Sequence, residues 1–168
     1  GSQSADGYEF DLVISPTENI DLAVSGLFID PIYDSYVGAA PGDLSGTVPS
    51  NTPDDTISST ITWNYNINGW DSFLRISHLY SSEAQLLENP VHQALIEAQG
   101  NGYRKQDTLN LTAGFEKENI SITLWGKNIN DDEFLTSAFI GVADLSETTF
   151  FGYPNSFKSY GLTLNYSF

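Results

Sequence analysis

The sequence predicts an all-β protein, an antiparallel meander of about eight strands. Short runs of alternating apolar and polar residues recur along the chain, and turn-forming residues separate them. No apolar stripe of helix length interrupts these runs. The last ten residues show the alternation best, because their apolar members all fall on one face of a strand. These members are Tyr160, Leu162, Leu164, Tyr166 and Phe168.

Four strands are expected in the first half of the chain, at residues 8–14, 20–28, 57–67 and 70–80. A turn at residues 16–19 joins the first two strands. Asn68-Gly69, the strongest short-range hairpin signal in the chain, joins the second two. Between these hairpins, residues 31–55 are rich in Gly, Pro, Ser and Asp, which predicts a long connection.

Four further strands are expected at residues 109–115, 120–124, 133–140 and 159–168. Residues 116–119 form the turn between the first two, and residues 141–157 form a loop between the last two. Residues 81–106 make a second long connection, in which residues 83–88 and 91–99 have a helix-like composition. The strands therefore form four antiparallel hairpins, whose apolar faces meet one another, lipid or protein outside this chain.

The composition narrows the class of protein. The chain has 168 residues, and its six Lys and Arg against 22 Asp and Glu give a net charge of −16, which argues against nucleic acid as a partner. Cysteine is absent, so the chain has neither disulfides nor thiolate metal ligands. Since methionine is also absent, we interpret Gly1-Ser2 as an expression scar.

Four segments carry a resemblance to a known family. Residues 7–11 read Gly-Tyr-Glu-Phe-Asp, residues 44–53 contain Leu-Ser-Gly followed by two prolines, and residues 124–134 contain Asn-Ile-Asn-Asp-Asp-Glu-Phe. The fourth segment is the closing strand. In order and spacing these segments resemble the carboxyl-terminal part of the β-barrel of TonB-dependent outer-membrane receptors. The departure is Phe157-Lys158, where the family usually has Pro-Arg.

The resemblance implies that residues 3–168 are a fragment of a barrel of about 22 strands that an internal plug closes. The family imports scarce nutrients, such as iron–siderophore complexes, vitamins or glycans, across the bacterial outer membrane, and TonB acts through the plug. The implied partners are outer-membrane lipid, the barrel-assembly machinery, and the rest of the barrel with its plug. We expect no enzymatic activity and no cofactor, and the fragment alone is expected to transport nothing. The resemblance does not specify which nutrient is the ligand.

The resemblance also assigns roles to residues. The assembly signal of outer-membrane barrels matches the closing strand at Ser159, Gly161, Leu164, Tyr166 and Phe168. The hairpin turn of the family matches Asn128, Asp131 and Phe134. Residue chemistry gives a similar expectation, because Asn and Asp side chains bind nearby backbone groups in tight turns. A Ca²⁺ site on the acids at 131–133 is the alternative.

Ligand contact is expected in the loop at residues 141–157, with Thr149, Phe150, Phe151 and Tyr153 as the candidates. Counting eight strands back from a periplasmic Phe168 puts this loop outside the cell. The same count puts the turns at Asn68-Gly69 and 116–119 outside and the long connections in the periplasm. That result conflicts with the usual arrangement of outer-membrane barrels, in which short turns are periplasmic.

Two other interpretations stay open, a self-contained eight-stranded outer-membrane barrel and a soluble β-sandwich that binds carbohydrate. The three tryptophans, Trp63, Trp70 and Trp125, are interpreted as aromatics of a membrane-interface belt. The spacing of His, Cys and acidic residues around His78 and His92 does not match that of a metal site.

A piece of a larger barrel has two open edges and an apolar face. We therefore expect the isolated chain to curl into a smaller closed or flattened barrel, or to pair its edges with another copy. Either arrangement would bury five apolar residues together: Leu109, Leu111, Ile120, Ile122 and Leu124.

Overall fold

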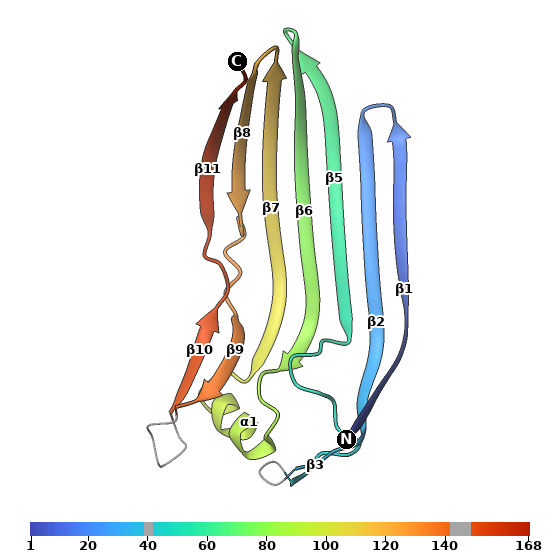
Figure 1. Cartoon of the computed structure of the whole chain (residues 1–168), viewed down its shortest axis with the longest axis vertical. Coiled ribbons are helices and arrows are strands. Elements are labelled where there is room, and N and C mark those ends of the chain that lie inside the picture. Colours follow the sequence, from blue (N-terminus) through green and yellow to red (C-terminus); the bar gives the residue numbers. More distant parts are fainter. Residues whose placement is uncertain (39–41, 142–148) are drawn as a thin grey trace.

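The computed structural model of the chain describes residues 1–38, 42–141 and 149–168. Its main feature is one seven-stranded antiparallel sheet in the order β1-β2-β5-β6-β7-β8-β11 (Figure 1). The strands are β1 (Ser2–Thr17), β2 (Ile20–Ser35), β5 (Asp55–Ile67), β6 (Trp70–Gln85), β7 (Tyr103–Lys117), β8 (Ile120–Lys127) and β11 (Ser159–Tyr166). Each strand pairs with its neighbour along the chain, which confirms the all-β meander.

Smaller elements lie outside this sheet. Two short ladders form, β3 (Val37–Gly38) with β4 (Gly42–Asp43), and β9 (Leu135–Ile140) with β10 (Phe150–Pro154). The helix α1 (Pro90–Glu97) begins after Asn89, whose side chain accepts hydrogen bonds from the backbone N–H groups of Val91 and His92. Among the described residues, no helix is long and apolar enough to cross a membrane.

The hairpin turns follow from local sequence. Asn68 and Gly69 both have positive φ, 53° and 80°, as the tight turn between two twisted strands requires. Asn and Gly are the residues that tolerate this conformation best, so the predicted hairpin of β5 and β6 is confirmed. The turns between β1 and β2 and between β7 and β8 are equally short.

The predicted fourth hairpin is wrong. Residues 133–140 were expected to pair with 159–168, but β8 pairs directly with β11, from Ser159↔Lys127 to Tyr166↔Ile120. The strand β9 pairs instead with β10, which lies in the segment expected to be a loop. The cause is the irregular segment at residues 128–134, where the chain leaves the large sheet between β8 and β9, and we call this segment the break. The large sheet therefore has seven strands and not eight.

The second long connection is also partly strand. Residues 83–88 were expected to be helix-like, yet β6 continues through Gln85. After a bulge between Ser81 and Ala84, the ladder resumes with Ala84↔Arg104 and Gln85↔Tyr103. The backbone hydrogen bonds of this ladder outweigh the weak helix propensity of so short a segment.

The buried apolar residues all gather at one end of the molecule. They are Pro31, Leu44, Pro49, Ala84, Leu86 and Ile96, from the two long connections and the strand ends beside them. Hydrogen bonds tie these connections together, since Asn51 N donates to Gln85 O at 2.8 Å and the Gln85 side chain donates to Val48 O at 2.9 Å. We call this end, with α1, β3 and β4, the packed end (Figure 1).

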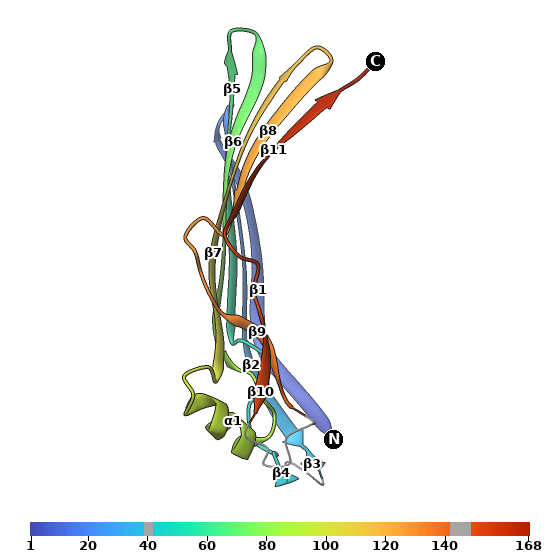
Figure 2. The same ribbon diagram turned by 90° about the vertical axis from the view of Figure 1, so that its left-hand side faces the viewer.

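The sheet itself is a single open layer, as the view along its edge shows (Figure 2). The expectation that the chain curls up and buries its apolar residues together is wrong. Leu111, Ile120 and Leu124 are 37%, 37% and 44% exposed, because no second layer covers their face. Among the described residues, β1 and β11 are unpaired edges of the large sheet. This architecture contradicts both the β-sandwich and the self-contained closed barrel.

The two ends of the sheet differ. The three short turns lie at the same end as Phe168, and the packed end lies opposite (Figure 1). The predicted placement of Asn68-Gly69 and 116–119 at the end opposite Phe168 is therefore wrong. The count failed because it took β9 as an eighth crossing of the sheet.

Candidate functional site

One face of the sheet is apolar across all seven strands. Residues directly opposite each other in an antiparallel ladder point to the same face, so the register defines each face. A single row crosses the sheet through Tyr160, Gly126, Leu111, Ile76, Ile61, Leu22 and Ile14. Most of these side chains are large, apolar and exposed. The chain thus presents a continuous hydrophobic surface far wider than a typical soluble monomer exposes.

The other face is mostly polar. The adjacent row runs through Gly161, Trp125, Thr112, Arg75, Thr62 and Asp21. Arg75 Nε donates to Thr62 Oγ1 at 3.1 Å, so neighbouring strands are joined by side chains on this face as well. One apolar face and one hydrophilic face are the arrangement of a barrel wall that separates lipid from a polar interior.

The tryptophans divide between the two faces. Trp63 lies on the apolar face, with its ring 4.8 Å from that of Tyr65, and Trp70 is opposite Ile67 on the same face. Trp125 is on the polar face, opposite Gly161. The interpretation of Trp125 as a belt aromatic is therefore wrong, whereas Trp63 and Trp70 occupy positions suited to it.

The closing strand β11 presents the residues of the expected assembly signal. Leu164 and Tyr166 are exposed on the apolar face, and Ser159 and Gly161 are on the polar face. Phe168 follows the strand and packs edge-to-face on Tyr166, with ring centroids 5.2 Å apart. Because β11 is an edge, one side of its backbone is free to pair with another strand. The assembly role stays a prediction.

The break between β8 and β9 is built around a buried amide. Asn128 is 3% exposed, and its Oδ1 accepts from Asp132 N at 2.8 Å while its Nδ2 donates to the carbonyls of Asp132 and Ser156 at 2.8 and 3.0 Å. Asn128 and Asp131 both have positive φ, 49° and 61°, which these residue types tolerate. The chain therefore turns out of the sheet here without glycine.

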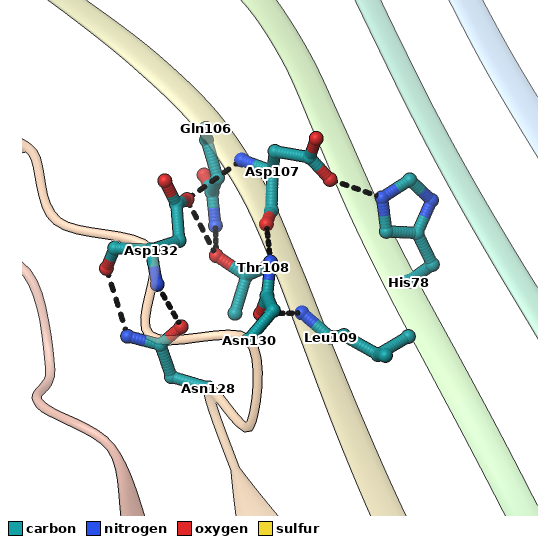
Figure 3. A network of polar contacts seen from close by, with 8 residues as sticks. All are labelled: His78, Gln106, Asp107, Thr108, Leu109, Asn128, Asn130 and Asp132. Carbon is teal, nitrogen blue, oxygen red and sulfur yellow. Dashed lines mark hydrogen bonds and ion pairs between the residues drawn. The ribbon is translucent and has the colours of Figure 1, made fainter.

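Two side chains in this break take over the role of a missing strand. The β7–β8 ladder ends at Leu111, and beyond it Ile129 N donates to Leu109 O at 2.8 Å. Asn130 Oδ1 accepts from Leu109 N at 2.9 Å, Asn130 Nδ2 donates to Asp107 O, and Asp132 Oδ2 accepts from Asp107 N at 2.7 Å (Figure 3). These bonds satisfy backbone groups that the break would otherwise leave open.

Sequence reasoning assigned the turn to Asn128, Asp131 and Phe134 and gave no turn role to Asn130 or Asp132. Phe134 lies at the far side of the break, where its N–H donates to Asn155 Oδ1 at 3.2 Å. Asp131 makes no side-chain hydrogen bond within the described part of the chain. The available signal was the density of Asn and Asp at residues 128–132, because such side chains bind nearby backbone groups in turns.

His78 extends the same network onto β6. Its Nε2 is 2.6 Å from Asp107 Oδ1, a contact that becomes an ion pair when the imidazole is protonated (Figure 3). Asp107 therefore connects β6 through its side chain and the break through its backbone. No group of three or more His, Asp or Glu that would hold a metal is present in the described ranges.

The candidate ligand residues lie on the β9–β10 ladder. Phe151 pairs with Phe139, and the Phe139 ring is 5.6 Å from that of Phe151 and 5.8 Å from that of Tyr153. Phe150 is opposite Ile140, and Thr149 O accepts from Gly141 N at 2.8 Å. This ladder extends away from Phe168 (Figure 1), and its aromatic side chains are largely exposed. Residues 142–148, which the expected loop includes, lie outside the described residues.

Comparison with known proteins identifies the kind of fold. No family model and no curated protein matches the chain. Among solved structures, the chain is similar to the ferric yersiniabactin uptake receptor FyuA from Yersinia pestis, with a TM-score of 0.77 and 12% sequence identity. The similarity covers 99% of this chain and 24% of that receptor. The chain therefore shares the fold of a segment of that receptor and spans about a quarter of the receptor's length.

Proposed function

We propose that the chain is the carboxyl-terminal segment of the β-barrel of a TonB-dependent receptor in the bacterial outer membrane. The observation that carries the proposal is the exposed apolar face that continues across all seven strands behind a polar face. Burying such a face in lipid avoids its exposure to water, and a polar face suits a hydrated interior. The likeness to a ferric yersiniabactin uptake receptor supports the same assignment at the level of the fold.

The proposal fixes an orientation. The three short turns and Phe168 would be periplasmic, and the packed end would be extracellular, as in other outer-membrane barrels. Seven crossings agree with this rule without the conflict that the count of eight strands produced. The exposed aromatic residues of the β9–β10 ladder, Phe151 and Tyr153, would then meet ligand on the outer side.

The edges of the sheet indicate the partners. In a closed barrel β1 and β11 would each pair with a strand of the remaining barrel, since unpaired edges are unstable in lipid. The barrel-assembly machinery would bind the closing strand, and TonB would act through the plug. The cargo would be a scarce nutrient such as an iron–siderophore complex. The chain would contribute wall and ligand surface, with no catalytic step.

Lipid-facing residues can be identified in the chain reconstituted in vesicles. Because the chain has no native Cys, single-Cys variants carry one fluorophore each. We expect doxyl-lipid quenching of the label at Leu162→Cys and Ile61→Cys. Labels at Thr163→Cys and Thr62→Cys, the adjacent positions on the polar face, should stay unquenched. Equal quenching at all four positions would contradict the proposal.

Transport is tested in the intact receptor that carries this chain. Deleting β11 should abolish growth on the cognate iron complex under iron limitation, while growth on free iron salts stays normal. Uptake that persists without β11 would show that this strand is dispensable and would contradict the proposed role of the chain in transport.

A further inference from the structure

A recess opens on the polar face beside the break. Because β9 pairs with β10 and not with β7, the β7 ladder has no strand on this side, and a space of about 390 Å³ opens there. Its lining is mostly polar or basic and includes Arg104, Gln106, Lys127 and Ser156. The volume is large enough for a small organic molecule.

The charge of this lining is opposite to that of the chain. Acidic residues outnumber basic residues 22 to six in the sequence. The recess nevertheless contains two of the six basic residues, Arg104 and Lys127, and none of the acidic ones. A positive recess in so acidic a chain attracts anions selectively, because the surrounding carboxylates repel them elsewhere.

Arg104 has unused hydrogen-bonding capacity. Its Nε is buried and has no hydrogen-bond partner among the described residues, and its guanidinium forms no ion pair there. Arg104 also lines the recess, so its terminal N–H groups can meet an acceptor that enters there. A guanidinium binds a carboxylate or phosphate through two parallel hydrogen bonds, which its two terminal nitrogens can supply.

Lys127 adds a second cation to the recess. Its Nζ lies 5.4 Å from the centroid of the Trp125 ring, which holds the ammonium on the polar face. Neutral polar groups, including Gln106 and Ser156, complete the lining. The recess therefore offers two positive charges and several hydrogen-bonding groups on one wall of the proposed barrel interior.

We propose that this recess binds a small molecule through its oxyanion group, a carboxylate or a phosphate, with Arg104 as the bidentate partner and Lys127 as the second cation. This inference rests on the proposed function because it takes the polar face to line the path of the cargo. It assigns an anionic, oxygen-rich chemical class to that cargo. The ability of the recess to bind anions does not depend on the transport assignment.

The test titrates the full chain, in non-ionic detergent micelles at constant ionic strength, with citrate and with inorganic phosphate. Trp63→Phe and Trp70→Phe leave Trp125 as the sole tryptophan, and its fluorescence reports events at Lys127. We expect a saturable change with at least one anion and none with glycerol. The arm that saturates at lower concentration distinguishes a carboxylate ligand from a phosphate ligand.

Matched variants separate this site from general charge effects. Arg104→Gln should weaken anion binding about tenfold or more. Arg104→Lys should weaken it less, because the positive charge remains while the two parallel hydrogen bonds of the guanidinium are lost. Lys105→Gln removes the same charge one residue away, where the side chain is on the opposite face, and should leave affinity within about twofold. Circular dichroism verifies that every variant keeps its strand content.

Three results would overturn the inference: no saturation with either anion in the folded chain, equal losses in Arg104→Gln and Lys105→Gln, or binding by the chain that disappears in the intact receptor. The last result would mean that a carboxylate of the intact receptor itself occupies the recess. Lipid quenching at Leu162→Cys tests the proposed function separately, so the two failures are distinguishable.

Discussion

The side chain of Asn128 binds both backbone groups of Asp132, accepting from its N–H and donating to its C=O at 2.8 Å each. This pair closes the turn by which the chain leaves the large sheet. The amide is also buried, so water cannot replace the lost hydrogen bonds if it is removed.

Asn128→Ala should therefore destabilise the chain by about 2–4 kcal/mol, since it removes three hydrogen bonds at a buried site. Urea unfolding in micelles measures this loss. Asp131→Asn is the matched control, because Asn tolerates positive φ, and it should change stability by less than about 0.5 kcal/mol. Similar losses in the two variants would contradict this account of the turn.

Gly161 is required by its neighbour. A Cβ at this position would overlap Trp125 Cζ2 on the adjacent strand. Gly161→Ala should cost about 1–3 kcal/mol of stability through overpacking. The double variant with Trp125→Ala should recover most of that loss in a double-mutant cycle. If the glycine acted only as an assembly signal, Trp125→Ala would give no recovery.

The two faces of β11 should respond differently to charge. Leu164 is 63% exposed on the apolar face, and Thr163 is on the polar face. Leu164→Arg should cost about 2–4 kcal/mol in a bilayer, and Thr163→Arg clearly less. Reversible unfolding in lipid vesicles provides the comparison. Equal penalties would show that the two faces are assigned wrongly.

Removal of Phe168 from the intact receptor should reduce its level in the outer membrane. The terminal ring packs on Tyr166 and completes the aromatic end of the apolar face. Heat-modifiable mobility on a gel reports correct assembly. As the control, Phe168→Tyr retains the aromatic ring and should assemble normally. Normal assembly of the receptor that lacks Phe168 would contradict the assembly role.

Sequence periodicity predicted those parts of the fold in which local and tertiary preferences agree. The hairpin at Asn68-Gly69 needs positive φ at both residues, and the sequence supplies the residue types that adopt it. Residues 83–85 show the opposite case. Their composition favours a helix, but pairing with β7 decides their conformation, and no local pattern reveals that partner.

The break between β8 and β9 could be predicted only in part. Asn128 was recognisable as a turn residue, whereas the roles of Asn130 and Asp132 depend on the backbone of Leu109 and Asp107, which are 21 and 25 residues away in sequence. The recess at Arg104 was not predicted either. It exists because β9 departs from the sheet, and the sequence contains no sign of that departure apart from the turn itself.

The packed end affects the energetics of any encounter at that end of the molecule. Gln93 Nε2 donates to Gly102 O at 2.6 Å, and the Ser50 hydroxyl donates to Glu88 Oε2 at 2.5 Å, so the long connections are held by their own contacts. A molecule that arrives there meets a backbone that is already ordered. The conformational entropy lost on association then falls mainly on the arriving molecule, which favours rigid ligands over flexible ones.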